Sequence, residues 1–317
     1  MQLLNNLKLK DLNKILLKIF YFFIPIIFLL GFLEFQLRTH HFTSSYAAKK
    51  YYLEQQLDSI ETLVLGSSES FNGIDPTYFY SRTFNLANVS QTLFYDKAIT
   101  LKHVAKMPKL KNVIINISYF SFFYQLHDIK EKWRDDYYKL YFNINFSDDK
   151  NFTINQYAYL AVYQLKHSIG LAFNNFKDSN AVNILPNGYQ PRMNQELIND
   201  STGLARVNIH HNQIFKHRRK EIEKDVEDFV EKLKRKSINI IFITTPVYTT
   251  YSKFCNPKII EQNLNFINQL TSKYQCKYFN YFTDTSFKKI DFFDNDHLNN
   301  NGSKKLSIRL NNEMQNN

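Results

Sequence analysis

The chain has 317 residues, of which 44% are hydrophobic and 22% charged, so it can bury a core and is not a disordered polypeptide. Its formal net charge of +11 favours anionic neighbours such as phospholipid headgroups, acidic glycans or nucleic acid. Its two cysteines, Cys255 and Cys276, exclude a disulfide-dense miniprotein and a zinc site made of cysteines alone.

The amino-terminal segment is strongly apolar. Between Ile15 and Leu33 only Lys18 is charged, and apolar residues continue to Leu37. This length suits a helix that crosses a bilayer, which takes roughly 20 residues. A cleaved signal peptide has a shorter apolar stretch before a small-residue cleavage site, and only a poor version of that site follows. We therefore predict an uncleaved transmembrane helix at residues 15–37.

The flanks of this segment predict its orientation. Residues 1–18 carry four lysines against one aspartate, whereas basic and acidic residues balance at three each in 34–58. The positively charged flank is expected to stay inside, which predicts a single-pass protein of the cytoplasmic (inner) membrane with an extracytoplasmic C-terminal part. There a Cys255–Cys276 disulfide can persist, and a reduced pair is an equal interpretation. The predicted divisions are a cytoplasmic tail (1–14), the transmembrane helix (15–37), a polar stalk (38–60) and an extracytoplasmic domain (61–317).

Beyond residue 60, short apolar runs alternate with helical patterns. Strands are predicted at 62–65, 83–86, 112–118, 238–244 and 277–280. Helices are predicted at about 96–105, 154–173, 216–236 and 256–272. The charge pattern of 216–236 indicates a helix with an exposed, charged face. This alternation predicts a parallel sheet with helices on both faces. Ligands of such sheets gather beyond the carboxyl ends of the strands.

The connection between the predicted strands at 112–118 and 238–244 is too long for a single strand–helix–strand unit, which takes roughly 30 residues. We therefore predict an inserted subdomain near the site, at about 121–215. It is rich in aromatic residues that can stack on sugar rings, although burial in the core is the default interpretation: Trp133, Tyr137, Tyr138, Tyr141, Tyr157 and Tyr163.

Two short motifs carry the chemistry. Gly66-x-Ser68 follows the first predicted strand, where a sharp turn can expose a hydroxyl beside backbone N–H groups. Asp294-x-x-His297 precedes the C-terminal helix, and this spacing lets the carboxylate bond Nδ1 while Nε2 takes the serine proton. Asp296, adjacent to the histidine, is expected to face solvent or stabilise the loop.

These motifs together resemble the SGNH (GDSL-like) hydrolase superfamily, in its membrane-anchored, cell-envelope type. The resemblance includes the segments 73–76, 84–90 and 297–302 and spans about 61–308. It implies a flavodoxin-like three-layer α/β/α fold, with Ser68 as nucleophile, His297 as general base and acid, and Asp294 as the orienting carboxylate.

The resemblance also implies an oxyanion hole. The amides of Ser68 and Ser90 are its expected donors, either alone or with Asn88. The family often has an asparagine donor after strand three, and here Asn116 lies within the strand and does not match. No cofactor and no metal are expected, since His210, His211 and His217 have no further ligand at suitable spacing and read as a solvated loop.

The leading hypothesis is a serine esterase or O-acyltransferase that acts on a cell-envelope polysaccharide through an acyl-serine. A transferase needs a partner to deliver acyl groups, such as a multi-span membrane acyltransferase. The expected partners are thus the glycan, the lipid bilayer around the helix and that protein, with no nucleic acid. The alternatives are a non-catalytic SGNH-like module for glycan binding or complex assembly, and a tethered α/β domain whose motifs are coincidental.

Overall fold

The structure is a computed structural model of the chain, and it describes residues 2–40, 43–146, 157–163, 165–174 and 183–316. Its centre is a five-stranded parallel sheet in the order β2-β1-β3-β4-β5. The strands lie close to the predicted positions: β1 Thr62–Leu65, β2 Thr83–Asn85, β3 Asn112–Asn116, β4 Asn239–Thr244 and β5 Lys277–Asn280. The predicted α/β fold is confirmed, and its strand order is that of flavodoxin-like sheets.

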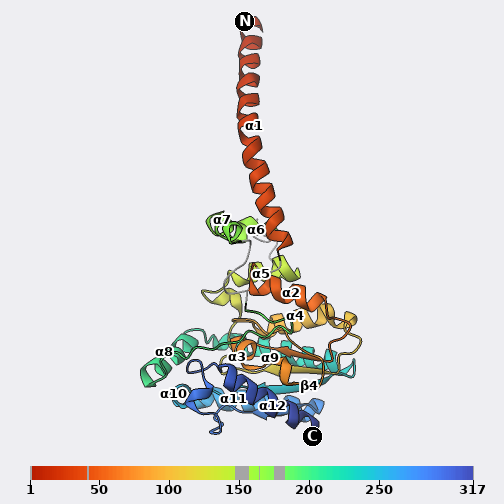
Figure 1. Cartoon of the computed structure of the whole chain (residues 1–317), viewed down its shortest axis with the longest axis vertical. Coiled ribbons are helices and arrows are strands. Elements are labelled where there is room, and N and C mark those ends of the chain that lie inside the picture. The colour runs from red at the N-terminus through yellow and green to blue at the C-terminus, as the bar shows by residue number, and fades with distance from the viewer. Residues whose placement is uncertain (1, 41–42, 147–156, 164, 175–182, 317) are drawn as a thin grey trace.

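Helices cover both faces of the sheet. On one face lie α4 (Leu93–His103), α9 (Arg219–Lys234) and α11 (Pro257–Tyr274), which pack side by side. On the other face lie α3 (Ser68–Gly73) and α12 (Asn300–Asn316), which also contact each other. Figure 1 shows these layers below a long projecting helix.

The alternation of strand side chains explains the two layers. Successive residues of a strand point to opposite faces, so Leu63 and Leu65 join the cluster under α4 and α9 while Val64 joins the cluster under α12. All four residues of β1 are buried, as expected for a parallel strand covered on both sides. The apolar runs of the sequence therefore follow from burial on two faces.

The amino-terminal helix α1 (Gln2–Thr39) projects away from the domain (Figure 1). Its residues Leu12–Thr39 form the one described helix that is long and apolar enough to cross a membrane. Large apolar side chains in this stretch are exposed, for example Phe28 at 74%. The helix supports the predicted membrane span, and the predicted orientation and compartment stay predictions.

The segment expected as a polar stalk is folded into the domain. Helix α2 (Ser45–Glu54) buries half of its residues, including Tyr46 and Leu53. Lys49 is 1% exposed, and its Nζ donates to the carbonyl of Asn85 at 2.7 Å. The prediction of a stalk is therefore wrong for this stretch, because the polar lysine and tyrosines find partners inside the fold.

The predicted insertion lies between β3 and β4. It contains α5 (Arg134–Phe142), α6 (Tyr159–Tyr163), α7 (Leu165–Phe173) and α8 (Asp200–His211), and a short helix α10 (Thr249–Ser252) after β4 packs on α8. The single helix predicted at 154–173 begins outside the described residues, and its described part forms α6 and α7.

The aromatic residues of the insertion divide into two groups. Tyr138, Tyr141 and Tyr163 are buried, as the default interpretation expected, whereas Trp133 is 46% exposed and Tyr157 is 51% exposed. The two cysteines are both free thiols, so the reduced interpretation holds for this structure.

Candidate active site

A sharp turn at the carboxyl end of β1 presents Ser68. Gly66 has a φ of +125°, and a Cβ atom there would lie 2.9 Å from the Cβ of Asn116, so only glycine fits. The Gly66 N–H donates to the Asp96 carboxylate at 3.0 Å, which fixes the turn. Ser68 is the first residue of α3, beside the point where the sheet order reverses between β1 and β3.

The neighbouring serines, Ser67 and Ser70, are both buried. Ser67 is 5% exposed, and its hydroxyl lies 3.2 Å from that of Ser118. Ser70 is fully buried under the turn, whereas Ser68 is half-buried. The hydroxyl of Ser68 is therefore the one of the three that is placed for chemistry.

Ser68, His297 and Asp294 are joined by hydrogen bonds. The Ser68 Oγ lies 2.7 Å from Nε2 of His297, and Nδ1 of the same ring lies 2.9 Å from Oδ2 of Asp294. Asp294 Oδ1 also accepts the backbone N–H groups of Asp296 and His297, at 3.0 and 2.8 Å. The structure thus brings together the three residues that the motifs predicted.

The electrostatics of this group favour a basic imidazole. Burial acts to lower the pKa of His297, but the charges of Asp296 and Asp294 outweigh it, so the pKa is raised on balance. Burial likewise acts to raise the pKa of Asp294, and the charge and hydrogen bond of His297 bring it below its usual range. His297 can therefore accept the Ser68 proton while Asp294 stays ionised.

Asp296 contradicts the expectation that it faces solvent. It is 2% exposed, and its two oxygens accept from Nε of Arg206 at 2.8 and 2.9 Å. Its Oδ1 also lies 3.4 Å from Nδ1 of His297. The reason is tertiary: helix α8 of the insertion places a guanidinium beside this carboxylate, and a buried charge needs such a partner.

The histidines of α8 also differ from the expected solvated loop. His210 is 5% exposed, and its Nδ1 lies 2.6 Å from the hydroxyl of Tyr251. Burial and the charge of Arg206 hold the pKa of His210 well below its ordinary value, so this ring is neutral at neutral pH. His211 bonds the hydroxyl of Tyr119 at 2.7 Å.

Two of the three residues expected to form the oxyanion hole line the site cavity. Ser68 and Ser90 line one cavity, and in the described part of the chain no acceptor lies on either backbone N–H. Ser90 has a φ of +55°, in the left-handed region that favours glycine. Asn88 is used differently, since its N–H donates to the Gly66 carbonyl and its Oδ1 accepts from Ser45 and Val89.

A buried glutamate forms the floor beneath the serine turn. Glu69 is 4% exposed and accepts hydrogen bonds from Asn116, Ser118 and Thr245. Burial raises the pKa of this carboxyl, and the nearby charge of Asp296 adds to the effect. Asn116 therefore holds Glu69 and does not supply the missing oxyanion donor, in agreement with its place within the strand.

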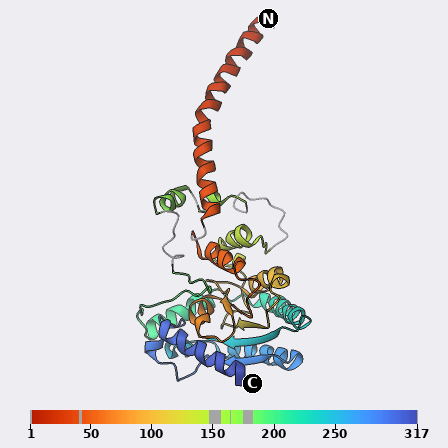
Figure 2. The same ribbon diagram turned by 45° about the vertical axis from the view of Figure 1, so that its right-hand side comes forward.

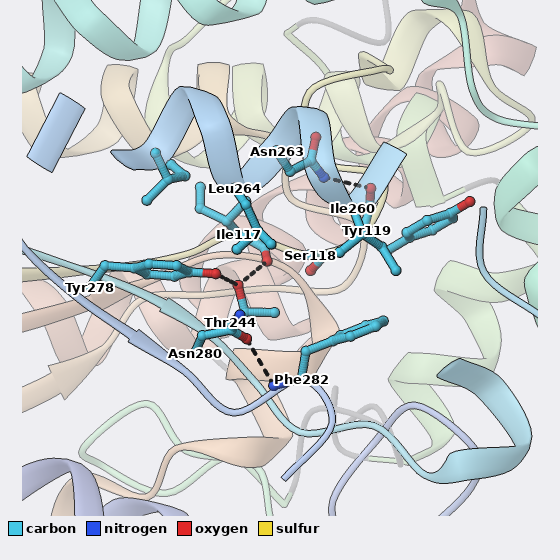
Figure 3. A pocket seen from close by; sticks show the side chains of 11 residues that line it. Ile117, Ser118, Tyr119, Thr244, Ile260, Asn263, Leu264, Tyr278, Asn280 and Phe282 are labelled. Atoms are coloured by element: carbon cyan, nitrogen blue, oxygen red, sulfur yellow. Dashed lines mark hydrogen bonds between the residues drawn. The ribbon is translucent and has the colours of Figure 1, made fainter. Parts of the chain in front are cut away.

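Ser68 opens into a cavity of about 310 Å³. Its lining combines residues after the strands with residues of the insertion: Ser68, Ser90, Asp294 and His297 from the former, and Tyr124, Glu131, Arg192, Glu196, Arg206 and His210 from the latter. Of these insertion residues only His210 stood out in the sequence, and there it was expected in a solvated loop. A different cavity, drawn in Figure 3 between Tyr278 and Asn263, has a volume of about 30 Å³ and is not the candidate site.

Asp294, Asp296 and His297 each offer a ligand atom within 4.8 Å of the others, a grouping that can hold a metal ion. These atoms already have partners, because Nδ1 of His297 bonds Asp294 and the Asp296 carboxylate is paired with Arg206. We therefore interpret the group as a proton-transfer site.

Fold and site together define an α/β domain with a serine, a histidine and an aspartate aligned at the sheet's switch point. No protein-family model matches the chain, and no curated protein matches it. The solved structures that are similar to it include two from Bacteroides species. One is a candidate acylhydrolase from Bacteroides fragilis, at 11% identity and a TM-score of 0.39, covering 83% of this chain and 95% of that one. The other is a GDSL-like lipase from Bacteroides thetaiotaomicron, at 9% identity and a TM-score of 0.42, covering 86% and 98%. These values are too low to assign an activity, so the functional argument rests on the site.

Proposed function

We propose that the protein is a membrane-anchored SGNH-type serine hydrolase or O-acyltransferase that works through an acyl-serine. The observation that carries the proposal is the continuous hydrogen-bonded line from Ser68 through His297 to Asp294. It matches the geometry that a nucleophile, a base and an orienting carboxylate require. The raised pKa of His297 supports the same assignment, because the charges of Asp296 and Asp294 make this imidazole a stronger base.

The proposed reaction has two halves. His297 Nε2 takes the proton of Ser68 while the Ser68 Oγ attacks the ester carbonyl. The carbonyl electrons move onto the carbonyl oxygen, and the amides of Ser68 and Ser90 would stabilise the resulting oxyanion. When the carbonyl re-forms, the bond to the leaving alkoxide breaks and His297 protonates it. Water or a sugar hydroxyl then loses its proton to His297, attacks the acyl-serine and frees the Ser68 oxygen, which is reprotonated.

A second hollow supports a carbohydrate as substrate or acceptor. It has a volume of about 280 Å³ and shares Val89 and Arg192 with the site cavity, so the two adjoin. Trp133 and Tyr137 line it, with ring centroids 5.4 Å apart in an edge-to-face arrangement. Exposed aromatic rings beside polar groups suit the apolar faces and hydroxyls of a sugar. We propose that a cell-envelope polysaccharide occupies both hollows.

The anchor places the reaction outside the cytoplasmic membrane in this proposal. The lysines in the first half of α1 would stay inside, and the domain would face the envelope. As a transferase the protein would need a multi-span acyltransferase to deliver acyl groups, and as an esterase it would release the acyl group to water. Purified protein supplied with an acyl ester and an acceptor sugar distinguishes these two cases by its products.

Hydrolysis of nitrophenyl acetate tests the proposal. Ser68→Ala should abolish turnover, whereas Ser67→Ala and Ser70→Ala should keep much of it, because their hydroxyls do not face His297. Equal losses in all three variants would point to a disrupted turn and leave the assignment of Ser68 unsupported.

One observation favours a non-catalytic module as the second candidate. Asn116 is bound to Glu69, so the site lacks the asparagine donor that the family often has. A glycan-binding or assembly role would then use the same cavity. Wild-type protein that binds glycan but shows no turnover would support this candidate over the first.

A further inference from the structure

Helix α7 carries an apolar stripe on its outer surface. Leu165, Ile169 and Phe173 follow one another at four-residue spacing, and they are 50%, 42% and 86% exposed. The other face of the helix is the covered one, with Ser168 fully buried and Leu171 at 3%. A helix of a soluble domain places its apolar stripe toward the core. Helix α7 has a second apolar stripe that stays exposed, which marks it as an interaction surface.

Helices α6 and α7 are fixed to the end of the membrane helix. Both contact α1, and Figures 1 and 2 show α7 beside the end of α1 that enters the domain. The Glu34 carboxylate of α1 accepts the backbone N–H groups of Tyr159 and Leu160 at 3.1 and 2.9 Å. Arg38 bonds Glu34 at 2.7 Å and lies 4.9 Å from the centroid of the Tyr159 ring.

The exposure of α1 locates this attachment relative to a bilayer. Phe32 is 55% exposed, whereas Leu33 and Leu37 are 5% and 0% exposed because the domain covers them. A hydrocarbon layer of about 30 Å takes about 20 helical residues at 1.5 Å each. Counted from Ile15, that length ends at Glu34, the residue to which α6 is bound. The outer boundary of the hydrocarbon therefore falls at the level of α6 and α7.

We propose that α7 docks on the same bilayer, with its apolar stripe in the acyl region just below the headgroups. The stripe continues the exposed apolar surface of α1, where Phe35 is 61% exposed, and in a bilayer lipid would surround that surface. Three side chains are too few for a stable dimer, which buries about 800 Å² on each partner. Tyr157, exposed nearby, is of the type enriched at membrane interfaces.

This second contact would fix the orientation of the domain. A single helix lets the domain rotate about the membrane normal and tilt on its anchor, whereas an anchor plus an interfacial helix holds the Ser68 cavity at one height and one tilt. The inference rests on the proposed membrane span of α1 and is independent of the proposed chemistry.

Lipid quenching of tryptophan fluorescence tests the docking on the full chain in nanodiscs. Trp133 is the sole tryptophan, so a Trp133→Phe background makes each introduced tryptophan a single reporter. Phe173→Trp reports on α7, Phe28→Trp on the span, and Ile290→Trp on a 70% exposed site in the short helix Lys289–Asp291 beside α12. All three positions are exposed, so the variants should fold.

We expect lipids brominated near the headgroup to quench the Phe173→Trp variant strongly and lipids brominated deep in the chain to quench the Phe28→Trp variant. The Ile290→Trp variant should be unaffected by either. Phe173→Trp fluorescence as insensitive as that of Ile290→Trp, with Phe28→Trp quenched, would overturn the docking and leave the anchor intact. An unquenched Phe28→Trp variant would overturn the anchor itself. An unquenched but dimer-dependent signal from Phe173→Trp would assign the stripe to a second copy and overturn the lipid proposal.

Discussion

Two walls of the site cavity are held by different kinds of interaction. The reactive wall, formed by Ser68, Asp294 and His297, is fixed by nearby backbone: the Gly66 turn, and the Asp294 carboxylate that accepts N–H groups two and three residues on. The supporting wall, formed by Arg206 and His210 on α8, is fixed by side chains that meet residues 41 to 90 positions away. Changes to the first wall should therefore affect the rate, and changes to the second should affect stability and the pKa of His297.

The largest effect should come from Asp294→Asn. The amide keeps the shape of the carboxylate but favours the wrong tautomer of His297, a change that costs about 10⁴ in turnover in a serine protease. We expect a loss of up to that size, measured as kcat with nitrophenyl acetate, in a protein whose circular dichroism is unchanged. An unchanged kcat would reduce the reactive wall to Ser68 and His297 alone.

Asp296→Asn should show the opposite pattern. It removes the charge that partners Arg206, and breaking a buried ion pair is strongly destabilising. Because the Arg206 side chain is 32% exposed, we expect a discounted loss of about 1–3 kcal/mol in the free energy of unfolding. Chemical denaturation measures it. A larger loss of kcat than in Asp294→Asn would make Asp296 the orienting carboxylate.

The pH profile links the two walls. The base is competent only when His297 is neutral, so kcat/KM should rise with pH through its pKa, which the structure places above the ordinary 6.5. Asp296 contributes to that increase, so Asp296→Asn should move the rising limb to lower pH. A rise in kcat/KM at the same pH in both proteins would show that the charge of Asp296 does not affect the pKa of His297.

The smallest effect should come from Trp133→Ala. The indole is 46% exposed and lines the adjoining hollow, away from the reacting atoms. We expect an unchanged rate with nitrophenyl acetate and a severalfold increase in KM with an acylated oligosaccharide, since one ring contributes about 1 kcal/mol. Tyr80→Ala, at an exposed ring outside both hollows, is the matched control. Equal KM values in the two variants would argue against sugar binding at Trp133.

The sequence predicted the reactive wall because its residues lie in short motifs next to strands. The strands themselves were predicted because burial on both faces makes them continuous apolar runs, as in β1. The supporting wall could not be predicted in this way. Arg206 and His210 lie on a polar, weakly patterned helix, and their burial depends on contacts with Asp296 and Tyr251 that only the tertiary fold creates.

The same reason explains the error at α2. Its sequence is mostly polar or small, so it was expected to form a stalk. Its buried Lys49 nevertheless bonds the carbonyl of Asn85, and its Tyr46 packs against two tyrosines of α5. Local composition predicts an exposed helix, whereas satisfied polar groups allow a buried one.

Covalent labelling with a fluorophosphonate tests the central claim most directly, because it reads the nucleophile without requiring the natural substrate. The account predicts one adduct on the wild-type protein, mapped by mass spectrometry to Ser68, retained in Ser67→Ala and lost in Ser68→Ala and His297→Gln. An adduct on another residue, or none on a folded wild-type protein, would contradict it.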